Sequence, residues 1–135
     1  MPHDKASRAA RYASIVGRHA EDAVAAHLLN NGYTLLGRNV RVGRLELDIV
    51  ARKESLVVIV EVRHRGPTSW ETAFESVNAA KRQRLFRAAD RLWTHRFASD
   101  PTIDRVRIDI ASVSIEPSGT VVEYLEGGID RRDYS

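Results

Sequence analysis

The sequence predicts a single α/β domain, a mixed β-sheet flanked by helices, and three observations support this prediction. The 135 residues suffice for one hydrophobic core but not for two. Stretches with helical apolar spacing alternate with strand-like stretches, in the order helix, three-strand meander, helix, two strands. The stretch between the third and fourth strands is long enough for a crossover connection, which would make these two strands parallel.

The first predicted element is a helix that begins between Ser7 and Ser14. Its apolar residues recur every three or four positions, and Asn31-Gly32 supplies a left-handed stop. Residues 1–13 are expected either to be flexible or to extend this helix. No repeat or linker interrupts the rest of the chain, so residues 1–135 are expected to form one domain.

Three strand-like stretches follow the first helix, and short polar breaks join them into an antiparallel meander. They are YTLLGRNVRV, LELDIVAR and LVVIVEVRH. A second helix is expected after the loop around Gly66-Pro67, with Asn78 as its N-cap and Asp100-Pro101 as its end. The last two predicted strands are RVRIDIASVSI and TVVEYLE.

Composition excludes several classes of protein. The chain contains no cysteine, which rules out disulfide scaffolds, thiolate zinc sites, iron–sulfur clusters and cysteine nucleophiles. No apolar run approaches the length of a membrane span, and the first residues lack the apolar core of a secretory signal. We therefore expect a cytoplasmic protein with no membrane partner.

Positive charge is concentrated in the predicted second helix, although the net charge is only +3. Between Asn78 and Phe97 the only acid is Asp90, and the basic residues are Lys81, Arg82, Arg84, Arg87, Arg91 and Arg96. A polyanion such as DNA is the natural partner of a basic face, because each neutralised phosphate releases counterions. The alternative is an ordinary solvated surface helix.

Acidic residues on two neighbouring strands form the first candidate site. Alternation places Glu46 and Asp48 on one face of the second strand, and Leu45, Leu47 and Ile49 on the other. Glu61 ends the most apolar run of the chain, where an unpaired carboxylate is costly to bury. Two carboxylates held close together require a proton, an arginine or a metal ion between them, and oxygen ligands suit Mg²⁺ or Mn²⁺. Alternatively, Glu61 pairs with Arg63 and the other acids lie on a solvated face.

Glu21 is a further candidate, because it lies in a small and apolar stretch of the first helix, AEDAVAA. Its neighbour Asp22 faces about 100° away, so one of the two acids can face the sheet while the other is solvated. The alternative is an exposed helix carboxylate.

Five segments of the chain together resemble one known family. They are GRHAEDAVAAHLLNNGYTLLGRNVR, LELDIVAR, VVIVEVRHR, AAKRQRL and RVRIDIASV. These segments resemble the YraN-like proteins, which have the restriction-endonuclease-like fold of the PD-(D/E)xK nucleases. The resemblance places the family's acidic positions on Glu21, Asp48 and Glu61. Glu46 lies beside Asp48, and Lys81 matches a basic position of the family pattern.

The resemblance implies a metal-dependent phosphodiesterase site. In it Asp48 and Glu61 would hold Mg²⁺ or Mn²⁺, and Glu21 would complete the site or bind a second ion. The basic helix would track the phosphodiester backbone through Lys81, Arg82, Arg84 and Arg87.

The chain departs from the family pattern at three positions. Ala20 and Leu45 replace glycines that contribute no ligand, whereas Arg63 replaces the motif lysine. An arginine at this catalytic position can stabilise negative charge, but it stays protonated and cannot act as a general base. We therefore expect weak hydrolysis by the natural protein.

The sequence thus predicts a nucleic-acid-binding, endonuclease-like protein. Structured or branched DNA is implied as its substrate only by similarity to the archaeal Holliday-junction resolvases, which also implies a homodimer. Two alternatives stay open: a non-catalytic nucleic-acid-binding module that keeps the nuclease fold, and a protein–protein adaptor whose carboxylates are structural.

Overall fold

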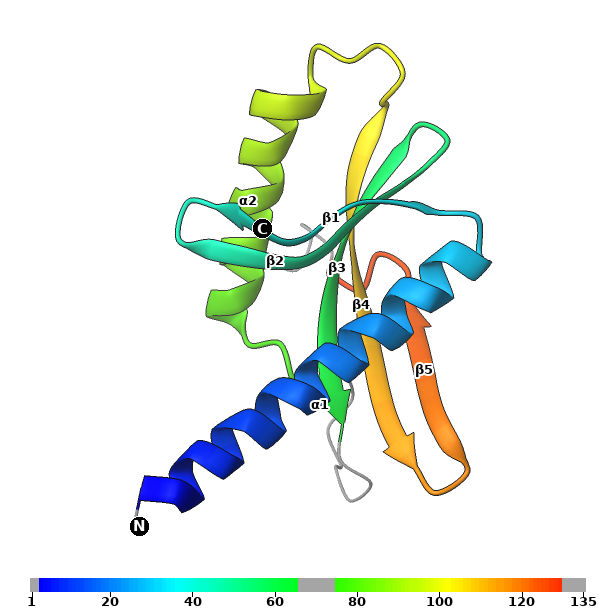
Figure 1. Cartoon of the computed structure of the whole chain (residues 1–135). Helices are drawn as coiled ribbons and strands as arrows, with labels where there is room; N and C mark the ends of the chain where they lie inside the picture. The colour runs from blue at the N-terminus through cyan, green and yellow to red at the C-terminus, as the bar shows by residue number, and fades with distance from the viewer. Residues whose placement is uncertain (1–2, 66–74, 130–135) are drawn as a thin grey trace.

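A five-stranded mixed sheet forms the centre of the protein, in the strand order β1-β2-β3-β4-β5. The computed structural model describes residues 3–65 and 75–129. Helix α1 lies on one face of the sheet and α2 on the other (Figure 1). The elements are α1 (His3–Asn30), β1 (Thr34–Val42), β2 (Leu45–Lys53), β3 (Leu56–Arg65), α2 (Ala79–Leu92), a π-helical turn (Trp93–Phe97), β4 (Arg105–Glu116) and β5 (Gly119–Leu125).

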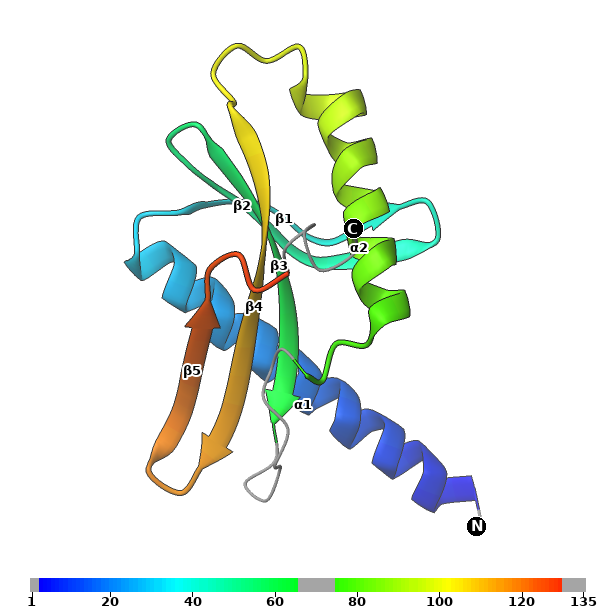
Figure 2. The ribbon, with the colours of Figure 1, turned by 180° about the vertical axis from the view of Figure 1, so that it is seen from behind.

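The strand directions confirm the predicted topology. Strands β1, β2 and β3 form an antiparallel meander, and β5 pairs antiparallel with β4. Strands β3 and β4 are parallel and are joined through α2, which packs against the sheet as the predicted crossover helix (Figures 1 and 2). The α/β mixed sheet flanked by helices is therefore confirmed.

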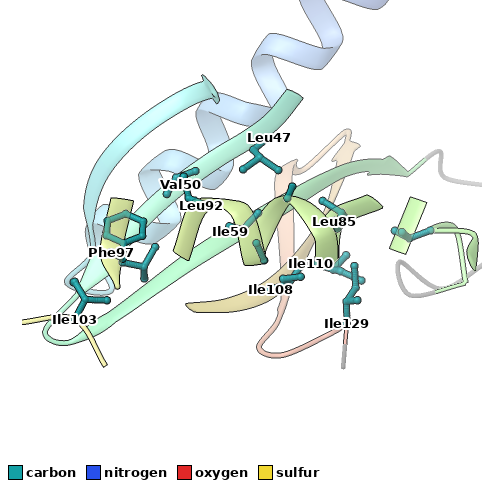
Figure 3. Packing of buried hydrophobic residues seen from close by; sticks show 14 residues of the cluster. Leu47, Val50, Ile59, Leu85, Leu92, Phe97, Ile103, Ile108, Ile110 and Ile129 are labelled. Carbon is teal, nitrogen blue, oxygen red and sulfur yellow. The ribbon is translucent and has the colours of Figure 1, made fainter. Parts of the chain in front are cut away.

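Two apolar cores lie on opposite faces of this sheet. The first, which we call the α2-side core, joins Leu85 and Leu92 of α2 to Leu47, Ile59 and Ile110 of three strands (Figure 3). The second, the α1-side core, packs α1 against the other face of the same strands. Its members include Val24, Leu28, Ile49, Val60 and Ala111. The buried β3 contributes to both cores, which is why its sequence is an uninterrupted apolar run.

Two predicted helix boundaries were wrong. Helix α1 begins at His3, before the predicted start, so the helix extends through most of residues 1–13. The α-helical part of α2 ends at Leu92, before Asp100, and a π-helical turn follows, in which Ala98 N–H donates to the carbonyl five residues back. The wider turn lets Leu92 and Phe97 both reach the α2-side core, although they are five residues apart. The loop predicted around Gly66-Pro67 lies outside the described residues.

None of the helices in the described ranges combines the length and the apolar character needed to span a membrane.

Candidate functional site

The candidate site lies where β2 separates from β3. The ladder between these strands ends at the pair Ile49 and Val60, so Asp48 has no ladder partner on β3. The Asp48 side chain bonds to β3 in place of the backbone ladder: Val62 N–H donates to Asp48 Oδ2 at 2.8 Å. This hydrogen bond holds the Asp48 carboxylate beside β3, next to Glu61.

The regular alternation of β2 is broken at Asp48. Leu47 packs in the α2-side core and Ile49 in the α1-side core, although the sequence pattern predicted a shared face. On β1, Asn39 lies opposite Asp48 and has a left-handed backbone with φ of 53°. Asparagine tolerates this conformation better than most residues, and such a residue interrupts the pleat. At this irregularity the Asp48 side chain turns toward β3 and accepts the hydrogen bond from Val62 N–H.

Glu61 is the most unusual carboxylate of the site, since only 4% of its side chain is exposed. Its Oε1 lies 3.5 Å from Lys81 Nζ and 3.8 Å from Arg63 Nη1. Its Oε2 is buried and accepts no hydrogen bond from any described residue. This oxygen is therefore open either to a proton shared with Asp48, which lies within hydrogen-bond reach of the Glu61 side chain, or to an added cation.

The electrostatics follow from this crowding. Burial and, secondly, the charge of Asp48 raise the pKa of Glu61 to about 7, against the opposing effects of Lys81 and Arg63. Burial also raises the pKa of Asp48, against the hydrogen bond from Val62 N–H and the charge of Lys81. Each carboxyl therefore resists losing its proton until an added positive charge compensates.

The two cations beside Glu61 differ in their freedom. The guanidinium of Arg63 is tied to Ser76, with Nε donating to Oγ at 3.1 Å and Nη2 to the carbonyl at 3.0 Å. Lys81 approaches from the first turn of α2, which is fixed because Asn78 Oδ1 caps Lys81 N–H at 2.9 Å. Lys81 is one of the residues predicted to contact DNA, and in the structure its ammonium lies at the carboxylates.

Glu21 does not join this cluster. It lies on α1 and pairs with Arg38 at 3.4 Å, and Arg38 also binds Asp22 at 2.8 Å. Burial and the nearby charge of Asp48 raise the pKa of Glu21. The protonation of Glu21 is therefore coupled to the charge of Asp48, although its ion pair is with Arg38. Within the part of the chain that the structure describes, no three His, Asp or Glu side chains gather closely enough to hold a metal ion.

The Asp48–Glu61 pair nevertheless fits a divalent ion that also needs substrate oxygens. Mg²⁺ is commonly held by one or two carboxylates together with waters and substrate phosphates. The unpartnered Oε2 of Glu61 and the carboxylate of Asp48 supply hard oxygen donors of this kind. The donor set therefore fits Mg²⁺ or Mn²⁺.

The predicted basic residues of α2 divide into two groups. Arg82 is partly buried and donates from Nε to the Val77 carbonyl at 2.7 Å, so it supports the start of the helix instead of facing a partner. Arg84 and Arg87 are exposed, as predicted for a binding surface. The structure adds Arg44 beside them, a residue that was not predicted because nothing in the sequence around it indicates a contact with α2.

Comparison with known proteins identifies relatives of this chain. The model of the family described as "Uncharacterised protein family UPF0102" matches residues 20–113. The UPF0102 protein sce2912 of Sorangium cellulosum is 48% identical over 104 residues, which are 77% of this chain and 72% of that protein. A UPF0102 protein of Syntrophotalea carbinolica is 35% identical over 117 residues, 85% of this chain and 91% of that one.

Among solved structures, Pyrococcus furiosus SfsA in complex with Ca²⁺ is similar with a TM-score of 0.42 and 17% sequence identity. The match covers 84% of this chain and 63% of that one, slightly less than two thirds of its length. This likeness is too distant to support a conclusion about the chemistry of the present chain.

The family match covers more than half of the chain and includes all four residues around the carboxylates, Asp48, Glu61, Arg63 and Lys81. The topology also has the order of elements expected of the YraN-like resemblance. The chain therefore belongs to the UPF0102 or YraN family, which has the restriction-endonuclease-like fold.

Proposed function

We propose that this protein is a metal-dependent nuclease that hydrolyses phosphodiester bonds of DNA. The observation that carries the proposal is the buried carboxyl pair of Glu61 and Asp48 beside the Lys81 ammonium, in which Glu61 Oε2 accepts no hydrogen bond from the described residues. A purely structural carboxylate at this depth would be expected to have its acceptors satisfied. Asp48 and Glu61 are the residues that would hold Mg²⁺ or Mn²⁺.

The reaction requires a water oxygen to form a bond to phosphorus while the bond from phosphorus to the leaving sugar oxygen breaks. The proton lost by the water ends on the departing oxygen, so the products are a phosphate monoester and an alcohol. A bound divalent ion supplies charge that polarises the phosphodiester and acidifies the attacking water. The two carboxylates of the chain position that charge and balance it.

Lys81 supplies the ammonium that the Arg63 position lacks. Its Nζ lies 3.5 Å from Glu61 Oε1, whereas Arg63 is held by Ser76. A compact ammonium can orient the attacking water and stabilise negative charge that develops on the phosphate. The replacement of the motif lysine by Arg63 therefore no longer argues for weak hydrolysis, because a lysine reaches the site from α2.

The exposed arginines of α2, Arg84 and Arg87, would contact backbone phosphates and give affinity without sequence preference. Branched or structured DNA is a substrate suggested by the family resemblance alone, so it is included in the test below.

A nuclease assay with Mg²⁺ or Mn²⁺ on duplex, single-stranded and four-way-junction DNA tests the proposal. We expect cleavage by the natural protein, its loss with EDTA, and its loss in Asp48→Asn. The control Glu54→Gln removes an exposed carboxylate outside the site and is expected to retain activity. Calorimetry with Mn²⁺ in the same variants separates ion binding from catalysis.

If the natural protein binds DNA but cuts none of the three substrates, the nuclease proposal is wrong. The non-catalytic binding module then becomes the better description. Equal Mn²⁺ binding by Asp48→Asn and Glu54→Gln would reduce the site to ordinary surface carboxylates.

A further inference from the structure

The turn between β1 and β2 lies against α2, and the two elements enclose a groove lined by arginines. We call it the arginine groove; its lining residues are Val42, Arg44, Leu45, Arg84, Arg87, Ala88 and Arg91. Its volume is about 440 Å³. Both ribbon views show the hairpin turn beside the middle of α2 (Figures 1 and 2). We propose that this groove holds one strand of nucleic acid by its phosphates and leads it to the carboxylates, an inference that rests on the proposed function.

At one end of the groove the Arg91 guanidinium lies against Gly43 of the hairpin turn. This residue has a left-handed backbone with φ of 60°, and a Cβ atom there would lie 2.6 Å from Arg91 Nη1. The positive φ favours glycine at this position, and the end of the Arg91 side chain reaches across to the turn. Arg44, the next residue, then faces the arginines of the helix across the hollow.

The charge of the groove is uncompensated. Four arginines line the groove without an ion pair or hydrogen bond to any residue in the described ranges: Arg44, Arg84, Arg87 and Arg91. No acidic side chain is among the residues that line it. Four guanidinium groups around one space repel each other until anions enter. Phosphates suit this role because a guanidinium can bind two phosphate oxygens at once.

The dimensions favour a single strand over a duplex. The hollow has the volume of a small-molecule pocket, which admits a short sugar–phosphate segment but not the body of a double helix. Val42, Leu45 and Ala88 supply an apolar lining that suits the sugars. No aromatic side chain lines the groove, so bases would not stack there and recognition would be through the backbone.

The groove is aligned with the candidate active site. Lys81, Arg84, Ala88 and Arg91 are spaced by three or four residues and therefore share one face of α2. A rise of about 1.5 Å per residue puts Arg91 about 15 Å and Arg84 about 5 Å from Lys81 along the helix axis. A strand bound by the arginines would thus run toward the ammonium that contacts Glu61.

Binding without metal tests the inference separately from hydrolysis. Fluorescence anisotropy of a short labelled single strand in EDTA would compare the natural protein with the double variant Arg44→Ala/Arg91→Ala. We expect affinity to fall about tenfold or more, and the salt slope of log K to fall by about one to two. The matched control is Arg18→Ala/Arg105→Ala, which removes the same charge from exposed positions on α1 and β4 and is expected to stay within about twofold.

Equal losses in the two double variants would show diffuse electrostatic binding and overturn the groove assignment. A duplex probe of the same length is expected to bind more weakly than the single strand. A duplex that binds equally well, with the same loss in the groove variant, would overturn the single-strand assignment. Because no metal is present, the result is independent of whether the protein cleaves DNA, and thermal unfolding of each variant confirms that it is folded.

Discussion

Two buried carboxylates on neighbouring parallel strands have opposite surroundings. Asp109 on β4 is fully buried and accepts hydrogen bonds from Arg107 Nε and Nη2, from the Tyr124 hydroxyl and from Gly127 N–H. Glu61 on β3 is buried almost as deeply, yet its Oε2 has no partner in the described part of the chain.

The two carboxylates also face different cores. Asp109 pairs in the ladder with Val60 of the α1-side core, and Glu61 pairs with Ile110 of the α2-side core. A carboxylate whose acceptors are filled by its own protein stabilises the fold and has nothing left for a ligand. One that is buried, crowded by Asp48 and incompletely satisfied costs stability, which is typical of functional sites. The comparison predicts that substitutions will separate stability from activity.

The largest effect is expected at the satisfied carboxylate. Asp109→Asn removes the buried ionic partner of Arg107 and leaves only the exposed Glu126 at 3.8 Å. Breaking a buried ion pair in this way costs about 3 kcal/mol or more of unfolding free energy. Urea denaturation measures this loss. Glu61→Gln is the matched substitution and is expected to cost nothing or to stabilise. Equal destabilisation by the two variants would remove the distinction between the carboxylates.

The second effect concerns activity. Lys81→Met is expected to lower metal-dependent cleavage about a hundredfold, about 2.7 kcal/mol of barrier, while leaving the urea midpoint nearly unchanged. Arg63→Lys is expected to change the rate by less than about threefold, because Arg63 is engaged with Ser76. A large gain in Arg63→Lys together with an unaffected Lys81→Met would return the catalytic role to position 63.

The third effect is a pH dependence of stability caused by Glu61. Its pKa is raised in the folded protein to about 7, so the folded state holds a proton that the unfolded chain releases near pH 4.5. Stability from this group is present at low pH and is lost as the pH rises through 7. The stability of Glu61→Gln relative to the natural protein should therefore rise by about 3 kcal/mol between pH 4 and 8, since one unit of pKa shift corresponds to about 1.4 kcal/mol.

The groups that face Glu61 and shape this titration are Asp48, Lys81 and Arg63. Urea denaturation across the pH range measures the difference, with Glu54→Gln as the control expected to show none of it. A difference that is flat with pH would mean that folding does not shift the pKa of Glu61.

The smallest effect is expected from Tyr124→Phe. It removes one donor to Asp109 but keeps the ring that stacks on His27 at a centroid distance of 5.1 Å. Three donors to Asp109 remain, so the expected cost is about 1 kcal/mol with no change in cleavage. A change in cleavage rate without a change in stability would link this network to the active site.

The site residues show which features of the site the local sequence pattern can predict. The closeness of Asp48 and Glu61 was predicted because β2 and β3 are adjacent and antiparallel. The two residues do lie close together, although the predicted alternation of β2 is interrupted at Asp48. The break at Asp48 coincides with the left-handed Asn39 of the neighbouring strand, which the apolar pattern of β2 could not reveal. Charge counting identified the basic helix but could not distinguish Arg82, which bonds its own backbone, from the exposed Arg84.

By itself, the sequence determined the order of the elements, the antiparallel meander and the parallel crossover pair, because apolar period and connection length are properties of the chain alone. Only the tertiary structure decided that Lys81 meets Glu61, that Glu21 pairs with Arg38, and that Arg44 faces α2. These contacts join elements that are distant in the chain. They depend on where strands diverge and how closely a hairpin turn can approach a helix, which is set by packing across the sheet.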